Sequence, residues 1–395
     1  MPRTPTANVE PAVLAWARGS LGLALPDAAK KIGVKSDRLE AWEKGESQPS
    51  VAQLRKAATV YKRPLAVFFL PEPPRGFDAL RDFRVLPESG EGPWSPELRV
   101  AVRRAQEQQQ TAIELYEMLG ERLPELDRLS GQQDAEDFGS AVRERLGIKL
   151  ADQLKWPGSN PHLAFRAWAD AVESLGVLIF HARRVGLDEM RGFSLPEPVP
   201  VISVNGSDSP RGRLFTMIHE LAHLFLHATG VCDVREHSQT TSQNSAIETY
   251  CNRVAAAVLM PLNEFRSKAL AFGVAGPDWA DEHLQHLSEQ FSVSREAALR
   301  RLLTLGLTTP EIYEQKRQEY LKAYKKLHEK DKEKDGGPGY YRLKVGQLGH
   351  AYIDLALETH GQGLINRFEL ADALDVKVKQ VDKLLDELGG RAGAA

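Results

Sequence analysis

Cysteine is scarce in this chain, which has only Cys232 and Cys251 among its 395 residues. Two cysteines cannot form the disulfide framework on which many small secreted proteins depend. A long apolar run that could cross a bilayer is also missing, and the first residues, MPRTPTANVEPAVLAW, contain no apolar leader region. We therefore expect a cytoplasmic protein with reduced thiols and no membrane partner.

An excess of positive charge is absent as well. The 51 Lys and Arg residues stand against 54 Asp and Glu residues, which gives a formal net charge of -3. Because no overall basic field attracts the chain to nucleic acid, any contact with DNA has to be made by a local surface. The length exceeds that of one ordinary hydrophobic core and predicts about two or three domains.

Apolar residues recur at helical spacing over most of the chain, whereas GVLIF (176–180) and VPVISVN (199–205) have the β-branched composition of strands. We expect a loop between these two strands, with Gly186, Gly192, Pro196 and Pro198 in it. Residues 71–95 are rich in Pro and Gly, which is typical of a linker. We predict an α+β fold that is mostly helical, with a small mixed sheet. The expected parts are an all-α domain at 1–75, a linker and helical connector at 76–160, a central domain with the sheet at 161–310, and a charged helix with a small helix-turn-helix-like accessory domain at 311–395.

The stretch TMIHELAHLFLH (216–227) places titratable side chains inside an apolar helical pattern. His219 and His223 are one helical turn apart, so both imidazoles point to the same side. Zinc binds imidazole nitrogens and carboxylate oxygens, and a catalytic zinc keeps one position for water. Glu220 lies beside this pair, where it can take a proton from the metal-bound water. The motif predicts a zinc peptidase with Glu220 as its catalytic base.

A third metal ligand has to come from another segment. The next predicted helix, IETYCNRVAAAVLMP, begins near Ile247 and presents Glu248 and Asn252 on one face, while its alanines permit close helix approach. We expect Glu248 to be the ligand, and Zn²⁺ or Mn²⁺ to be the metal, because two imidazoles and a carboxylate suit both. The alternatives are Asp233, Glu236 and His237 in the preceding loop, and His227 one turn further along the first helix.

Four stretches within residues 160–262 carry a family resemblance: GVLIF, GFSLPEPVPVISVN, RGRLFTMIHELAHLFLH and IETYCNRVAAAVLMP. They resemble the ImmA/IrrE metallopeptidases, which have a zincin-like HExxH helix and a downstream glutamate ligand. The resemblance implies that His219, His223 and Glu248 bind zinc and that Glu220 is the general base. It also implies that VPVISVN forms the edge to which an extended substrate adds, with a plain core strand as the alternative. Cys251 stands where the family more often has alanine, and we expect this change to affect packing rather than ligation.

A second pattern lies in LPDAAKKIGVKSDRLEAWEKGESQPS, with Gly33 in a turn and Leu39 and Trp42 facing a core. Its spacing resembles the XRE/Cro-type helix-turn-helix, whose second helix presents its N-terminal residues to the major groove. Glu43 is expected to hold neighbouring backbone. The residues expected to contact DNA are Lys35, Ser36, Asp37, Arg38 and Ala41, with Lys44 at the phosphates.

One helix-turn-helix module reads only a half-site, so we expect a homodimer on operator DNA, with the long helix predicted at 96–126 as a candidate dimer element. The resemblances imply a DNA-binding regulator fused to a zinc endopeptidase that cleaves a specific protein, a repressor or an antitoxin, in a stress, mobile-element or toxin-antitoxin response. The alternative is an XRE-type antitoxin or autorepressor that binds a cognate toxin and whose metal site is structural or inactive. A third hypothesis has the N-terminal module recognise the substrate repressor rather than DNA.

Overall fold

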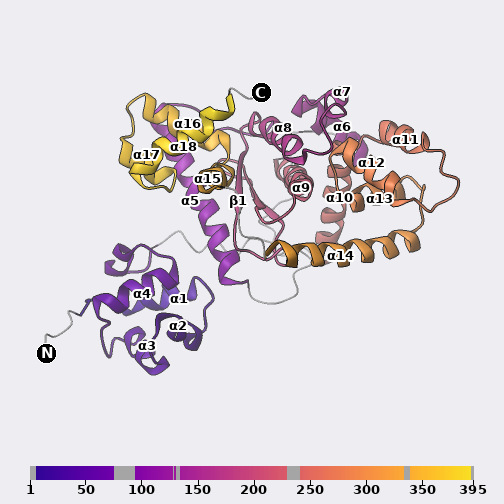
Figure 1. Cartoon of the computed structure of the whole chain (residues 1–395). Coiled ribbons are helices and arrows are strands. Elements are labelled where there is room, and N and C mark those ends of the chain that lie inside the picture. The colour runs from indigo at the N-terminus through magenta and orange to yellow at the C-terminus, as the bar shows by residue number, and fades with distance from the viewer. Residues whose placement is uncertain are drawn as a thin grey trace. The chain divides into compact units, whose positions relative to one another are not determined.

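The computed structural model describes residues 6–74, 94–127, 129, 134–228, 241–332 and 339–392. The chain divides into two compact units. The first contains residues 1–104 together with 184–189, and the second contains residues 105–183 and 190–395. Within the described ranges, no helix has both the length and the apolar character that a membrane span requires. The predicted α+β class, with helices around a small mixed sheet, is confirmed (Figure 1).

The first unit is built from short helices around one core. Gly33 ends the second helix with a φ of 82°, a left-handed conformation that suits glycine. Ser50 starts the fourth helix with a reciprocal capping box, in which its side chain and that of Gln53 bond to each other's backbone amides. The helices of this part are α1 (Pro11–Gly19), α2 (Leu25–Ile32), α3 (Ser36–Glu43), α4 (Val51–Tyr61) and the 3₁₀ helix η1 (Leu65–Phe69).

The second unit contains the three-stranded sheet and most of the longer helices. The helices before the sheet are α5 (Pro96–Leu119), whose first turns belong to the first unit, then α6 (Ala135–Leu146), α7 (Leu150–Gln153) and α8 (Pro161–Glu173). The helices after the sheet are α9 (Pro210–Ala228), α10 (Thr241–Leu259), α11 (Leu262–Leu270), α12 (Asp281–Phe291), α13 (Arg295–Thr304), α14 (Pro310–Lys332), α15 (Tyr340–Leu348), α16 (His350–Gly361), α17 (Arg367–Ala373), the 3₁₀ helix η3 (Val378–Gln380) and α18 (Val381–Ala392).

The sheet has the strand order β1-β3-β2, formed by β1 (Leu178–Ala182), β2 (Gly192–Leu195) and β3 (Val201–Asn205). β3 pairs in parallel with β1 and antiparallel with β2. The stretch GFSL, expected to lie in a loop, is the strand β2, so that expectation was wrong. VPVISVN contains the central strand β3, so the edge position implied by the resemblance was wrong and its alternative, a plain core strand, is confirmed. β3 is buried along its whole length, with a strand paired along each edge and α9 packed against it.

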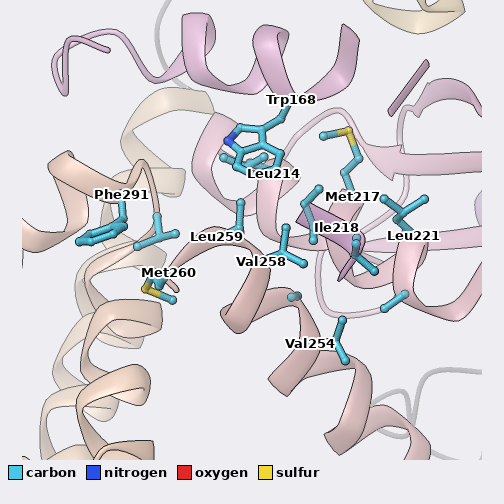
Figure 2. Packing of buried hydrophobic residues seen from close by; sticks show 14 of the residues in the cluster. Trp168, Leu214, Met217, Ile218, Leu221, Val254, Val258, Leu259, Met260 and Phe291 are labelled. Atoms are coloured by element: carbon cyan, nitrogen blue, oxygen red, sulfur yellow. The ribbon is translucent and has the colours of Figure 1, made fainter. Parts of the chain in front are cut away.

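The main core lies where α9 packs on α10 and α8. Leu214, Met217 and Ile218 of α9 meet Val258 of α10 and the fully buried Trp168 of α8 (Figure 2). Apolar residues on two sides of α9 are thus covered, which explains why its sequence is apolar almost all round. α10 begins at Thr241 and not near Ile247 as predicted. Its additional first residues, TSQNSA, are polar or small, so apolar periodicity did not reveal them.

The opposite face of the sheet is covered by the C-terminal helices. In Figure 1, α15 lies on one side of β1 and α9 on the other. Phe180 of β1 packs edge-to-face on Tyr352 of α16, with ring centroids 5.4 Å apart. The Glu173 carboxylate at the end of α8 accepts hydrogen bonds from the backbone amides of His350 and Ala351 at the start of α16. The helical tail that follows the charged helix therefore packs directly on the sheet.

Candidate metal centre

His219, His223 and Glu248 converge between α9 and α10. The two imidazole Nε2 atoms are 3.1 Å apart, and the Glu248 carboxylate reaches both, with Oε2 3.2 Å from His219 and Oε1 3.3 Å from His223. Ligand atoms at the usual distance from a tetrahedral zinc lie about 3.3–3.6 Å apart. Among the described residues, this is the group of His, Cys, Asp and Glu side chains that could hold a metal ion. The donor set and its spacing fit a divalent ion.

Local structure accounts for this convergence. His219 and His223 stand one turn apart on α9, and the tight contact of α10 against α9 brings Glu248 opposite them. The His219 side chain is 9% exposed, whereas those of His223 and Glu248 are 21% and 26% exposed. The cluster is therefore closed on its inner side and reachable by solvent from the outer side, as a catalytic centre requires.

The charges of the cluster compensate one another. Burial raises the pKa of Glu248, but the hydrogen bonds from His219 and His223 lower it by a larger amount. The resulting pKa lies below its usual range. Burial lowers the pKa of His223, while hydrogen bonds with Cys251 and Glu248 raise it more, to about 11. The carboxylate thus favours positive charge between the imidazoles, a charge that either a proton or a divalent ion supplies.

The first unit presents the helix-turn-helix geometry. Leu39 and Trp42 fix α3 to the core with exposures of 0% and 1%, which leaves the other face of α3 outward. On this outward face Lys44 forms an ion pair with Glu40, with Nζ of the lysine 2.6 Å from Oε1 of the glutamate. Of the residues expected to contact DNA, Lys35, Asp37, Arg38 and Lys44 are exposed, and Ser36 and Ala41 are partly buried.

Two family models match the chain. Residues 14–68 match the helix-turn-helix, and residues 172–303 match the IrrE N-terminal-like domain. The chain carries an N-terminal helix-turn-helix and a central IrrE N-terminal-like domain. The resemblances found in the sequence are thereby confirmed for both parts.

One curated relative also matches. Over 115 residues the chain is 31% identical to the radiation response metalloprotease IrrE of Deinococcus radiodurans. The matched stretch makes up 29% of this chain and 33% of that protein, so the chain spans about a third of the length of this relative. The IrrE N-terminal-like domain contains the sheet, α9 and α10, and with them the convergent side chains. This part of the chain is related to a metallopeptidase family.

Glu220 of the IrrE N-terminal-like domain lies beside the cluster and is 6% exposed. Its Oε2 accepts a hydrogen bond from the Ser194 hydroxyl on β2, at 2.9 Å. Sequence reasoning missed Ser194, because β2 was taken as a loop between two strands. The available signal was GFSL itself, in which Gly192 and Ser194 alternate with apolar residues over a strand-like period.

Of the other residues considered near the cluster, Cys251 and Asn252 are described by the structure, and the alternative metal ligands are not. Cys251 is buried, and its thiol contributes to the raised pKa of His223. The expectation that it affects packing rather than ligation stays a prediction. Asn252 is exposed on α10. The alternative ligands Asp233, Glu236 and His237, and the side chain of His227, lie outside the described residues.

Glu43 of the helix-turn-helix departs from its expected role. Within the described ranges its carboxylate forms a two-pronged ion pair with Arg18 of α1 rather than a bond to neighbouring backbone, with both nitrogen-to-oxygen distances 2.8 Å. Arg18 in turn donates to the backbone carbonyl of Leu23. The planar guanidinium matches both the carboxylate and the carbonyl, so it links α1 to α3 and to the turn before α2.

Proposed function

We propose that the protein is a zinc-dependent endopeptidase joined to a sequence-specific DNA-binding domain. The observation that carries the proposal is the convergence of His219, His223 and Glu248 beside a buried Glu220. Two imidazoles and one carboxylate are the protein ligands of many catalytic zinc ions, which keep a position open. Manganese is the alternative ion for the same donors.

The residues divide the chemistry of peptide hydrolysis between them. His219, His223 and Glu248 would hold the ion, which when bound polarises the scissile carbonyl and makes water a better nucleophile. Glu220 would accept the proton of the attacking water and then deliver it to the leaving amine nitrogen. Among the strands of the described residues, β2 lies at an edge of the sheet, and an extended substrate would add beside it by main-chain hydrogen bonds.

The proposed substrate is a regulatory protein, either a repressor or an antitoxin, whose cleavage changes transcription in a stress, mobile-element or toxin-antitoxin response. The name of the Deinococcus relative, a radiation response metalloprotease, supports proteolysis in a stress response. The helix-turn-helix supports a partner in operator DNA, bound by a homodimer through Lys35, Ser36, Asp37, Arg38, Ala41 and Lys44.

The test uses the Glu220→Gln variant of the full chain. This change removes the base and keeps the three donors, so the variant should retain zinc, lose cleavage and hold its uncleaved partner in a pull-down. Mass spectrometry of the retained protein would identify the substrate. An unaltered cleavage rate in the variant would refute Glu220 as the base.

The alternative is an antitoxin or autorepressor with a structural metal site, and the helix-turn-helix family match is the observation that favours it. It predicts that Glu220→Gln leaves the cellular phenotype unchanged and that a toxin is the protein retained. A separate binding test with residues 1–75 and duplex DNA addresses whether this module recognises DNA or the substrate protein. Operator binding by residues 1–75 would support recognition of DNA by this module.

A further inference from the structure

β2 and α9 meet along a narrow line of four residues. Gly192 and Ser194 are two residues apart on β2 and therefore point to the same face of the sheet. Thr216 and Glu220 are one turn apart on α9 and face them. A β-carbon at Gly192 would lie 2.5 Å from Thr216 Cγ2 and 3.4 Å from Glu220 Cγ. The glycine thus lets the strand approach the helix closely enough for Ser194 to reach Glu220.

We propose that Ser194 is a positioning residue for the catalytic base, an inference that rests on the proposed function. Its hydroxyl donates to Oε2 of Glu220 at 2.9 Å, which holds one carboxylate oxygen and leaves Oε1 as the oxygen that takes up the proton. A glutamate side chain has several rotatable bonds, and fixing them has an entropic cost that a charge-assisted hydrogen bond offsets. Ser194 therefore keeps Glu220 in one working orientation.

The location of Ser194 gives this contact a second consequence. β2 is an edge strand of the sheet and is the strand to which an extended substrate would add. The Ser194 side chain links Glu220 directly to that strand, in addition to the packing of α9, which carries Glu220. β2 would then hold both the substrate, through main-chain hydrogen bonds, and the base, through Ser194. A small displacement of β2 would therefore move the scissile bond and Glu220 together. Orientation at this level decides much of the rate of a proton transfer.

The experiment measures the binding of acetohydroxamic acid to the zinc-loaded full chain. A hydroxamate binds a zinc ion through two oxygens and passes its hydroxyl proton to a neighbouring base, so its affinity reports how well that base is placed. Ser194→Ala should weaken this binding about tenfold, the loss expected for one hydrogen bond to a charged group. Zinc affinity, measured by competition with a chromophoric chelator, should remain within about twofold of wild type. Ser194→Thr keeps a hydroxyl in a strand-compatible side chain and should restore most of the hydroxamate affinity.

Two controls separate positioning from a general loss of packing. Ser203→Ala removes a buried hydroxyl from β3 at the position paired with Phe193, on the face of the sheet opposite Ser194, and should leave hydroxamate binding unchanged. In a Glu220→Gln background, Ser194→Ala should cause little further loss, because the base on which it acts is gone.

Three results would overturn the inference: wild-type affinity in Ser194→Ala, an equal loss in the Glu220→Gln background, or no recovery with Ser194→Thr in a chain that unfolds at the wild-type temperature. A wild-type chain that bound no zinc would instead refute the metal centre itself. The two failures are thus distinguishable, because zinc affinity is measured separately from hydroxamate affinity.

Discussion

Gly192 of β2 lies against Thr216 of α9 so closely that a β-carbon on the glycine would come within 2.5 Å of the threonine methyl carbon, Cγ2. Contacts this short are not tolerated between carbon atoms, and the carbonyl oxygen of Ser203 at 3.1 Å closes the other side. Glycine is therefore required here for lack of space between a strand and a helix.

Gly192→Ala should lower the free energy of unfolding by about 1–3 kcal/mol, because the added methyl group overpacks this contact. Thr216→Ser removes the methyl group that would clash and should recover part of the loss in the double variant. Urea denaturation of the four chains measures both effects. If the losses of the two single variants simply add in the double variant, the clash with the Thr216 methyl group is not the cause of the Gly192→Ala destabilisation.

Glu248→Gln should reduce zinc affinity by at least about 100-fold, since an amide oxygen replaces a charged ligand and metal binding depends on that charge. Zinc at about 100 times its dissociation constant should stabilise the wild-type chain by about 2.7 kcal/mol and should leave this variant little changed. Thermal unfolding with and without zinc provides the measurement. Asn252→Ala, one turn further on α10 and exposed, is the matched control and should behave as wild type.

Glu173 should make stability depend on pH. Burial raises its pKa to about 7, against the opposing effect of the amides of Ala351 and His350. Between the ordinary value of 4.5 and about 7 the folded chain keeps a proton that the unfolded chain has released, so stability falls as pH rises through this window and levels off above it. The loss should be about 3 kcal/mol in wild type.

The Glu173→Gln variant should lack this contribution while its amide oxygen still accepts from the start of α16. Urea midpoints of both chains at pH 5 and pH 8 measure the difference, in which the contributions of other groups cancel. Parallel pH profiles for the two chains would show that Glu173 has an ordinary pKa in the folded state.

Arg38→Ala should weaken binding to a duplex selected from a random pool by about 1–3 kcal/mol and relax the preference at one base position, because Arg38 is exposed near the start of α3. Lys44→Ala should weaken binding evenly across sequences and reduce its dependence on salt, as a phosphate contact does. Fluorescence anisotropy at two salt concentrations distinguishes the two patterns. Equal effects of both variants on selected and unrelated duplexes would refute the assignment of Arg38 to base contacts.

The parts of the candidate site that lie within one helix were predictable from sequence. Helical spacing alone requires that His219 and His223 point to the same side, and it leaves Glu220 beside them. The same holds for the helix-turn-helix, in which Gly33, Leu39 and Trp42 specify a turn and a buried face. Glu248 was a candidate because its helix follows closely and carries small residues that allow near contact.

The parts that depend on contacts between separate segments were not predictable. β2 is a four-residue strand whose partner, β3, begins only after a loop containing three prolines, so its register depends on hydrogen bonds that local propensity does not encode. The same holds for the side-chain partners Ser194 with Glu220, Cys251 with His223, and Arg18 with Glu43.

The sequence by itself determined the helices, their apolar faces and the residue types that a divalent ion prefers, because these depend on the period of one helix and on side-chain chemistry. Only the tertiary structure decided that β3 is central, that β2 reaches the proposed base, and that the C-terminal helices cover the other face of the sheet. These features arise from close packing and from backbone hydrogen bonds between segments far apart in the chain, so they exist only once the segments have been brought together.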